Sequence, residues 1–520
     1  MLYIYYIKML DYLWIVIAGG IASFTAAMGI GANDVANAFA SSIGSRALTV
    51  KSAVIIASIF ECAGAILMGS HVTKTIRKGI ADYECFEDSP EIFMYGCFSV
   101  LISVTLWLFL ASYYEMPVST THSCVGGMIG MTMLAGGTDC VIWYKSTDSF
   151  PYIGGVSGIV LSWFLSPIFS AIISSLLFFI TRITVLRRQN SFDKVYVLMP
   201  IFIGLTLLLN SFFIIYKGGK GIGLDDISEF NAFLISFGIA LVCSLSIIPF
   251  IPHMKNVVEE RFIETNSPER QICINQNDIE ITENMNKCTK CITNIRNNIN
   301  YNVHNELNIN EKVKGIHDNS EKFDEKTEES FKYLQIFTAI CDSFSHGAND
   351  VANAIGPYAA IVFIYTNDGD MGKKIDMGNN AYWILSMGGI GITIGLLLYG
   401  YKIIKAIGVK LCCITPSRGY SIELGSAIVI IIGSRLGIPL STTHCQVGAT
   451  MGVAALDDLK TCSGINWKIA FKVFAGWIIT LVVVGSTSAL ITAQGIYAPT
   501  NDECSDIPHY LLSNNTNITL

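Results

Sequence analysis

The sequence predicts an all-α membrane protein that crosses the bilayer many times and consists of two related halves. Of its 520 residues, 52% are hydrophobic and only 14% are charged, which is too little polar surface for a soluble chain of this size. The eight residues GANDVANA occur at 31–38 and again, unchanged, at 347–354. A second motif, PVSTTH at 117–122, is matched by PLSTTH at 439–444. The same order in both halves indicates an internal duplication, which is common among transporters.

The composition argues against several other classes of protein. The net charge is −7, and the basic residues are scattered rather than gathered with aromatic residues, so we expect no nucleic-acid partner. Most of the fifteen cysteines lie in apolar runs, where cysteine acts as a small buried hydrophobe, so we expect no disulfide scaffold. Cys288 and Cys291 form a CxxC pair without further ligands at zinc spacing, and we expect no metal there. The first apolar run leads straight into GANDVANA, which argues against a cleavable signal peptide.

We expect the first membrane span, residues 13–43, to be a broken helix. Glycines and Asn33 interrupt its apolar run and favour an unwound segment between two half-helices. Asp34 follows directly, and an ionisable residue at membrane depth is costly and usually functional. Asn37 lies three residues further on, so it shares a face with Asp34 if the second half of the span is helical.

The first half, residues 1–252, is predicted to contain five more spans and one re-entrant element. Residues 117–137 are only moderately apolar and are rich in Ser, Thr and Gly, so we expect them to be broken or to fold back rather than to face lipid. The further spans are predicted at 47–69, with Glu61 near its middle, and at 92–114, 152–180, 195–216 and 227–251.

A change of composition separates the two halves. Residues 253–331 are rich in Asn, Glu, Lys and Ile, and twelve of the thirty-six residues from 275 to 310 are asparagine. This composition is typical of a solvated, disordered linker. The second half, residues 332–495, is predicted to have a broken span at 333–364, spans at 381–401 and 419–436, the second STTH element at 439–455 and a last span at 469–493. A tail follows at 496–520.

The short loops predict the orientation of the chain. Basic residues fall on one side of the membrane if each STTH element makes one net crossing, and that side should be cytoplasmic. The residues are Arg46, Lys51, Arg182, Arg187, Arg188, Lys194, Lys402, Lys405, Lys410 and Arg418. Both termini then lie outside a plasma membrane, the linker lies in the cytoplasm, and the two GANDVANA spans run in opposite directions. We therefore predict inverted repeats. Sequons at Asn514 and Asn517 agree with an outer carboxy terminus.

In an inverted-repeat transporter, the broken elements of both halves meet near the bilayer midplane. Hydroxyl groups beside free N–H groups at half-helix amino termini suit an oxyanion. The candidate oxyanion ligands of this kind are Ser119, Thr120, Thr121, Ser441, Thr442 and Thr443, with the amides of Asn37 and Asn353. Hard oxygens without a Lys or Arg in the motif suit a small alkali cation. The candidate cation ligands are Asn33, Asp34, Asn37, Asn349, Asp350 and Asn353.

The same residues also have purely structural interpretations. Ser and Thr in membrane helices often bond their own i−4 carbonyl, and Gly or Ala often serve close packing. The duplication argues against this reading for the two motifs. Glu61 and Glu423 are candidate coupling carboxylates, but a structural pair with backbone or a lysine is a rival. His122 and His444 either cap the hairpins or relay protons.

The motifs, in this order and in both halves, resemble those of the inorganic phosphate transporter family, the sodium–phosphate symporters and their proton-coupled relatives. The resemblance covers nearly the whole membrane part of the chain. It includes GANDVANAFASSIGSRALT at 31–49, IFECAG at 59–64, PVSTTH at 117–122, SHGANDVANAIGP at 345–357, RGYSIE at 418–423 and PLSTTH at 439–444. It implies phosphate and cation sites made by Asp34, Asn37, Asp350, Asn353 and the two STT triplets, and a functional role for Glu61 and Glu423.

We therefore predict a secondary transporter, not an enzyme, that imports inorganic phosphate with sodium by alternating access. Sodium is the only metal and coupling ion expected, no other cofactor is implied, and a homo-oligomer is left open. Proton coupling, or another oxyanion such as sulfate, is the alternative. A membrane hydrolase built on Ser119, His122 and Asp34 fits less well, because the sequence supplies these groups twice and a hydrolase needs one nucleophile with its base. An anion channel would show current without a coupled cation gradient.

Overall fold

The computed structural model describes residues 11–68, 79–146, 152–217, 227–265, 293, 296–298, 300–371, 380–435, 440–457 and 463–498. Within these ranges, eight helical stretches are long and apolar enough to cross a membrane, and the only sheet is one two-stranded hairpin, β1 (Lys145–Ser146) with β2 (Ile153–Gly154). The prediction of an all-α polytopic membrane protein is confirmed. The CxxC pair and both sequons lie outside the described residues.

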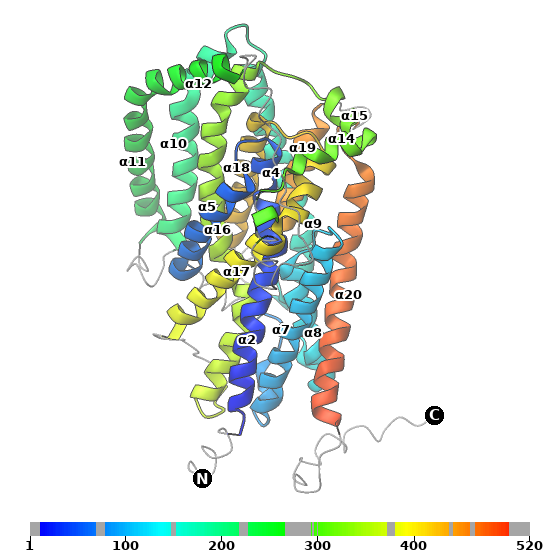
Figure 1. Cartoon of the computed structure of the whole chain (residues 1–520). Coiled ribbons are helices and arrows are strands. Elements are labelled where there is room, and N and C mark those ends of the chain that lie inside the picture. The colour runs from blue at the N-terminus through cyan, green and yellow to red at the C-terminus, as the bar shows by residue number, and fades with distance from the viewer. Residues whose placement is uncertain are drawn as a thin grey trace.

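The helices follow the predicted order of spans (Figure 1). The first half contains α2 (Leu13–Ile30), α5 (Val50–Met68), α7 (Pro90–Tyr113), α8 (Thr120–Ala135), α9 (Gly155–Thr181), α10 (Ser191–Lys217) and α11 (Glu229–Ile247). The second half contains α16 (Glu325–Thr366), α17 (Asn380–Lys405), α18 (Pro416–Arg435), α19 (Thr442–Ala455) and α20 (Trp467–Tyr497).

The two GANDVANA segments are less broken than expected. In the first, α2 passes into a widened π-helical stretch, η1 (Gly31–Val35), followed by the short helices α3 (Ala36–Ala38) and α4 (Ala40–Gly44). The second lies inside α16, which is continuous over 42 residues. The expected broken span at 333–364 is therefore wrong, and the first break is a π-helical widening.

The motif glycines have a packing role that explains this difference. A Cβ atom on Gly31 would lie 1.8 Å from the backbone oxygen of Ile392 in α17, and one on Gly347 would lie 2.2 Å from that of Glu61 in α5. Only glycine permits such close approach of two helix backbones. The glycines allow α17 and α5 to pack closely against the motif segments, and this packing does not require the helices to unwind.

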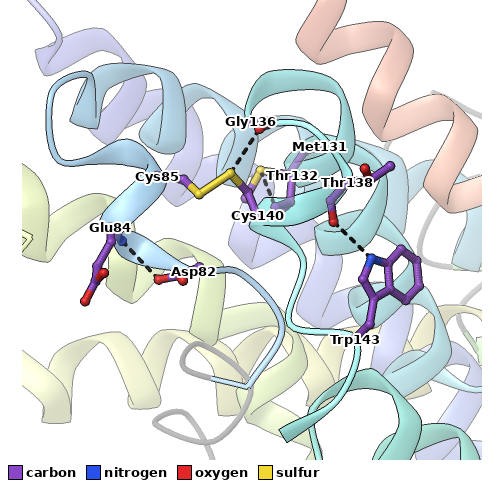
Figure 2. The surroundings of a disulfide bond; sticks show 9 residues. All are labelled: Asp82, Glu84, Cys85, Met131, Thr132, Gly136, Thr138, Cys140 and Trp143. Atoms are coloured by element: carbon purple, nitrogen blue, oxygen red, sulfur yellow. Dashed lines mark hydrogen bonds between the residues drawn. A yellow bond between two sulfur atoms is a disulfide. The ribbon is translucent and has the colours of Figure 1, made fainter.

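Each STTH motif begins the second arm of a helical hairpin. α7 packs against α8, and α18 packs against α19. A disulfide between Cys85 and Cys140 joins the chain before α7 to the chain after α8 (Figure 2). In the second hairpin, the Arg418 guanidinium in the first turns of α18 pairs with Asp457, just after α19. In both cases the two arms return to the same end of the molecule.

The sequence analysis did not predict the disulfide. Cys85 lies in the short helix η2 (Tyr83–Phe86) and Cys140 in η3 (Thr138–Cys140), and both lie outside the apolar runs that hold most of the other cysteines. Their position on either side of one hairpin was the available signal. Figure 2 shows that the bond lies beside the turn at Gly136, whose carbonyl oxygen is 3.0 Å from Cys140 Sγ.

The two motif-bearing helices run in opposite directions, α2 upward and α16 downward in Figure 1. The start of α2 and the end of α20 lie at the same end of the molecule, opposite to α14 (Glu306–Ile309) and α15 (Glu311–Asn319). This arrangement fits the predicted inversion, while the repeat relationship itself stays a prediction.

The stretch expected to be a disordered linker is partly helical. α12 (Ile251–Thr265), α14, α15 and the first turns of α16 fall within residues 251–331. Side chains of Asn310 and Asp324 cap α15 and α16, and Val303 and Val313 are buried. These caps and two apolar anchors give the polar sequence enough fixed contacts to fold onto the membrane part.

Candidate functional site

The amino termini of α8 and α19 meet at the centre of the candidate site. Ser119 caps α8 by accepting a hydrogen bond from the His122 N–H, and Ser441 caps α19 in the same way with the His444 N–H. The Ser441 hydroxyl donates to Ser119 Oγ at 2.8 Å. Both serines are buried. The positive ends of two helix dipoles, one from each half, therefore lie together away from solvent.

Asp34 in η1 connects the two hairpins. One of its oxygens accepts hydrogen bonds from the backbone N–H and the hydroxyl of Thr120. The other accepts a hydrogen bond from the Thr443 hydroxyl at 3.0 Å. Asp34 is only 2% exposed. The first motif thus contacts the STT triplets of both halves.

Asp350 in α16 makes the equivalent contact in the second half. Its Oδ2 accepts a hydrogen bond from the Thr442 hydroxyl at 2.6 Å, and its Oδ1 accepts one from the Asn349 amide at 2.8 Å. His346 Nε2 lies 2.9 Å from Asp350 Oδ2. In each half, therefore, the motif aspartate binds the middle residue of its own STT triplet.

The asparagines of the motifs have different roles. The amide of Asn353 donates to the hydroxyls of Thr120 and Thr121 at 3.1 and 3.4 Å, and its Oδ1 has no partner among the described residues. Asn33 accepts from the Val118 N–H and donates to the Met116 carbonyl. It therefore holds the α7–α8 turn, and both ends of its amide are already engaged. The structure does not describe the side chain of Asn37.

Glu61 on α5 lies beside the site. His346 Nδ1 is 3.1 Å from Glu61 Oε2, and the Ser343 hydroxyl donates to Oε1 at 3.3 Å. Because His346 also approaches Asp350, one imidazole bridges two buried carboxylates. The partner of Glu61 is thus a histidine rather than a lysine or backbone.

Glu423 on α18 lies in a cage of polar side chains, and no ion pair among the described residues includes it. The four that donate hydrogen bonds to it are Ser41, Ser42, Gln335 and Thr338. The sequence analysis did not find this cage, since its members come from α4 and from α16 without a common motif. Glu61 lies on α5, before the α7–α8 hairpin, whereas Glu423 lies on α18, the first arm of the α18–α19 hairpin.

His122 and His444 do not contact the aspartates. Their ring centroids are 4.5 Å apart, and each packs against a tryptophan, His122 on Trp163 and His444 on Trp477. His444 Nδ1 lies 3.0 Å from the Trp163 carbonyl oxygen. These contacts favour a structural role in the hairpins over a proton relay for both histidines. No sequence pattern pointed to the two tryptophans.

The chemistry of the site is that of buried carboxylates and hydroxyls. None of the ion pairs or hydrogen bonds among the described residues joins Asp34 or Asp350 to a lysine or arginine. The exposed fractions of Asp34, Asp350, Asn353 and the six STT residues are 5% or less. Such a closed set of hard oxygens can hold alkali cations, and the adjoining helix amino termini can hold an oxyanion.

Comparison with known proteins agrees with this chemistry. The model of the phosphate transporter family matches residues 30–488. The chain is 30% identical to the phosphate-repressible phosphate permease of Neurospora crassa, over 94% of this chain and 98% of that protein. It is 27% identical to the sodium-dependent phosphate transporter 1 of Mus musculus, over 93% and 95%. A solved structure described as the sodium-dependent phosphate transporter matches with a TM-score of 0.71 and 29% identity, over 93% of this chain and 100% of that one. The protein therefore belongs to the phosphate transporter family.

Proposed function

We propose that this protein carries inorganic phosphate across a membrane together with sodium ions by alternating access. The observation that carries the proposal is the paired contact of each motif aspartate with its STT triplet, Asp34 with Thr120 and Asp350 with Thr442. Cation ligands and oxyanion ligands are thereby held in one buried place. The names of the relatives support phosphate as the substrate and sodium as the coupling ion.

Phosphate is assigned to the amino termini of α8 and α19. Ser119 and Ser441 already bring these two ends into contact at 2.8 Å. Hydroxyl donors and helix amino termini are the usual partners of phosphate oxygens in a site without arginine. The two STT triplets supply the hydroxyls, and the Asn353 amide, which bonds Thr120 and Thr121, adds a further donor.

The cations are assigned to Asp34 and Asp350, with Asn349, Asn353 and Asn37 as candidate further ligands. Phosphate brings one or two negative charges beside two aspartates. Bare like charges about 5 Å apart repel by about 3 kcal/mol even at an effective dielectric constant of about 20. Bound sodium cancels this repulsion, so phosphate binds well only when the cations are present. Coupling then follows from electrostatics. Asn33 fits less well as a ligand, because both ends of its amide hold the α7–α8 turn.

The closed site and the opposed helices support alternating access. Asp34 accepts hydrogen bonds from both halves, so a movement of one half against the other changes the site directly.

We also assign the linker side, meaning the end of the molecule with α14 and α15, to the cytoplasm of a plasma-membrane protein. The Cys85–Cys140 disulfide directly precedes α7, whose first turns contact Trp14 at the start of α2. The start of α2 lies at the end of the molecule opposite to α14 and α15, and disulfides persist in oxidising compartments.

The test is uptake of labelled phosphate by the purified protein in liposomes, with external sodium replaced by choline at fixed pH. We expect uptake to require sodium and to saturate with phosphate. Labelled sulfate in place of phosphate tests the oxyanion. Sodium-independent uptake that rises steeply on acidification would instead favour proton coupling, for which the contact of His346 with both Glu61 and Asp350 is the supporting observation. Current without a coupled gradient would indicate a channel.

A further inference from the structure

Residues 301–321, here called the docked segment, lie against the linker-side ends of the membrane helices. The segment contains α14 and α15, and both pack against the π-helical stretch η8 (Ala406–Leu411) that follows α17. Val303 and Val313 are 2% and 1% exposed and belong to the same buried core as the first motif. A polar stretch of the linker is thus anchored to the transport part of the protein.

Two histidines of the segment bond the backbone of elements from different halves. His304 Nε2 lies 3.3 Å from the carbonyl oxygen of Ile43 in α4. His317 Nε2 lies 2.9 Å from the carbonyl oxygen of Val409 in η8. Histidine side chains near the end of a helix can hydrogen-bond its last carbonyl groups, and the Ile43 carbonyl also accepts a hydrogen bond from the Arg46 N–H. The segment therefore holds α4 of the first half and η8 of the second half at once.

α4 and η8 are in direct backbone contact beneath the segment. A Cβ atom on Gly44 would lie 2.1 Å from the backbone oxygen of Gly408, and one on Gly408 would lie 2.4 Å from that of Ala40. α4 follows directly on the motif that contains Asp34. The contact between α4 and η8 thus joins the two halves on the linker side, just after the motif that contains Asp34.

The far end of the segment repeats this arrangement. The Glu321 carboxylate accepts two hydrogen bonds from Arg187, at 2.8 and 3.1 Å, and one from Arg182 at 3.3 Å. The Glu321 backbone oxygen accepts a hydrogen bond from Arg418 in α18 at 3.0 Å. Arg182 and Arg187 belong to the first half and Arg418 to the second. Both ends of the segment therefore connect the two halves.

We propose that residues 301–321 form a brace across the linker-side ends of the two halves, which keeps that side closed and has to release before phosphate leaves there. This inference rests on the proposed function, because opening to the linker side requires the halves to separate there. The contacts include two imidazole hydrogen bonds, the hydrogen bond from Arg418 to the Glu321 backbone, and ion pairs of Glu321 with Arg187 and Arg182 and of Glu306 with Lys410. The side chains of Glu321 and Arg187 are 28% and 52% exposed. Partly exposed pairs are weak, so the brace can bias the equilibrium and still release.

The test compares three variants of the full-length protein by hydrogen exchange of backbone amides. Glu321→Gln removes the carboxylate charge that pairs with Arg182 and Arg187. The double variant His304→Ala/His317→Ala removes the two imidazole hydrogen bonds to α4 and η8. Asp193→Asn is the control, since it removes a carboxylate that pairs with Lys255 at 2.6 Å between α10 and α12, a pair that does not join the two halves. We expect exchange about tenfold faster in the segment, in α4 and in η8 for both brace variants, and unchanged for the control.

Two further measurements make the result decisive. Exchange in α20 should be unchanged in every variant, which shows that the fold is intact. The half-saturating external phosphate concentration should rise about three- to tenfold in the brace variants, because less of the protein faces outward. The brace is refuted if the segment loosens while α4 and η8 exchange as in the control. If the wild-type protein transports no phosphate, the proposed function fails, and the exchange of α4 and η8 still decides the brace.

Discussion

Ser441 donates a hydrogen bond to Ser119 across the two halves, at the point where the amino termini of α19 and α8 meet. Each serine also caps its own helix. The serine of each STTH motif therefore both caps its own helix and bonds the serine of the other motif, which holds the two helix amino termini together.

The first prediction concerns the serine pair. Ser441→Ala should raise the half-saturating phosphate concentration about ten- to a hundredfold, because a hydrogen bond to a charged group contributes about 1.5 to 3 kcal/mol. Ser488→Ala is a matched control, since Ser488 is a fully buried serine in α20 whose hydroxyl has no partner among the described residues. Saturation curves of labelled phosphate uptake measure both. Equal values in the two variants would place phosphate elsewhere.

The second prediction concerns the threonines that bind the aspartates. Thr120→Val and Thr442→Val remove the hydroxyls that donate to Asp34 and Asp350. Each should weaken phosphate binding at least about tenfold and should also change the sodium dependence, because the aspartate loses its donor. Thr492→Val is the control, as the Thr492 hydroxyl bonds only the carbonyl of Ser488 one turn earlier. Wild-type phosphate affinity in both site variants would show that the STT triplets contribute to helix packing and not to phosphate binding.

Much of this site could be predicted from the sequence, because both of its motifs are repeated. The motif aspartates and the STT triplets were expected to lie together, and in the structure Asp34 contacts Thr120 and Asp350 contacts Thr442. The family membership inferred from the motifs is also confirmed. The repeated motifs identify which residues lie in the site. They do not predict whether the helices that hold these residues are broken or continuous.

The features that could not be predicted depend on contacts between distant segments. Gly347 looked like a helix breaker, but its contact with the backbone of Glu61 explains it within a continuous helix. The donors around Glu423 come from two helices and have no common spacing. The folded part of the linker depends on Val303 and Val313, two apolar residues in a long polar stretch. Their burial requires a partner surface that no local pattern shows.

The third prediction concerns the coupling ion. Asp34→Asn and Asp350→Asn should lower phosphate uptake and weaken its dependence on sodium, since the charge that attracts the cation is lost. The measurement is phosphate affinity at several sodium concentrations and fixed pH, then at several pH values and fixed sodium. Asp193→Asn, an exposed aspartate paired with Lys255, controls for the loss of one charge. Unchanged sodium dependence in both site variants would remove these aspartates from the cation sites.

The fourth prediction separates the two parts of the linker. Replacing residues 270–290 by a Gly-Ser sequence of the same length should leave phosphate uptake within about threefold of the wild type, since the polar, Asn-rich composition cannot form a core. The same replacement over residues 301–310 should raise the half-saturating phosphate concentration, because it removes Val303, His304 and Glu306, which pairs with Lys410. Uptake at matched surface expression measures both. Complete loss of uptake in the first variant would contradict the prediction.

The last prediction is that acidification releases the docked segment through His304. Burial, together with the nearby charge of Arg46, lowers the pKa of His304 from 6.5 to about 4. The docked state therefore favours the neutral imidazole, and its contribution to docking is present above pH 6.5 and is lost as the pH falls from about 6.5 toward 4. His317 acts in the opposite sense. Burial alone would lower its pKa, but hydrogen bonds with Cys413 and with the Val409 carbonyl raise it above 6.5, against the charge of Arg418. Its contribution is present at low pH and is lost as the pH rises through that raised pKa.

The measurement is the protection factor of the amides in residues 301–320, which corrects for the effect of pH on intrinsic exchange. In the wild type, protection should fall between pH 6.5 and pH 5. His304→Gln keeps a neutral side chain at every pH, so it should remove most of this fall. In His317→Gln protection should be lower throughout this range and fall with the same slope, because the contribution of the His317 imidazolium is already complete below pH 6.5. Protection that falls equally in the wild type and in His304→Gln would show that the titration of another group releases the segment.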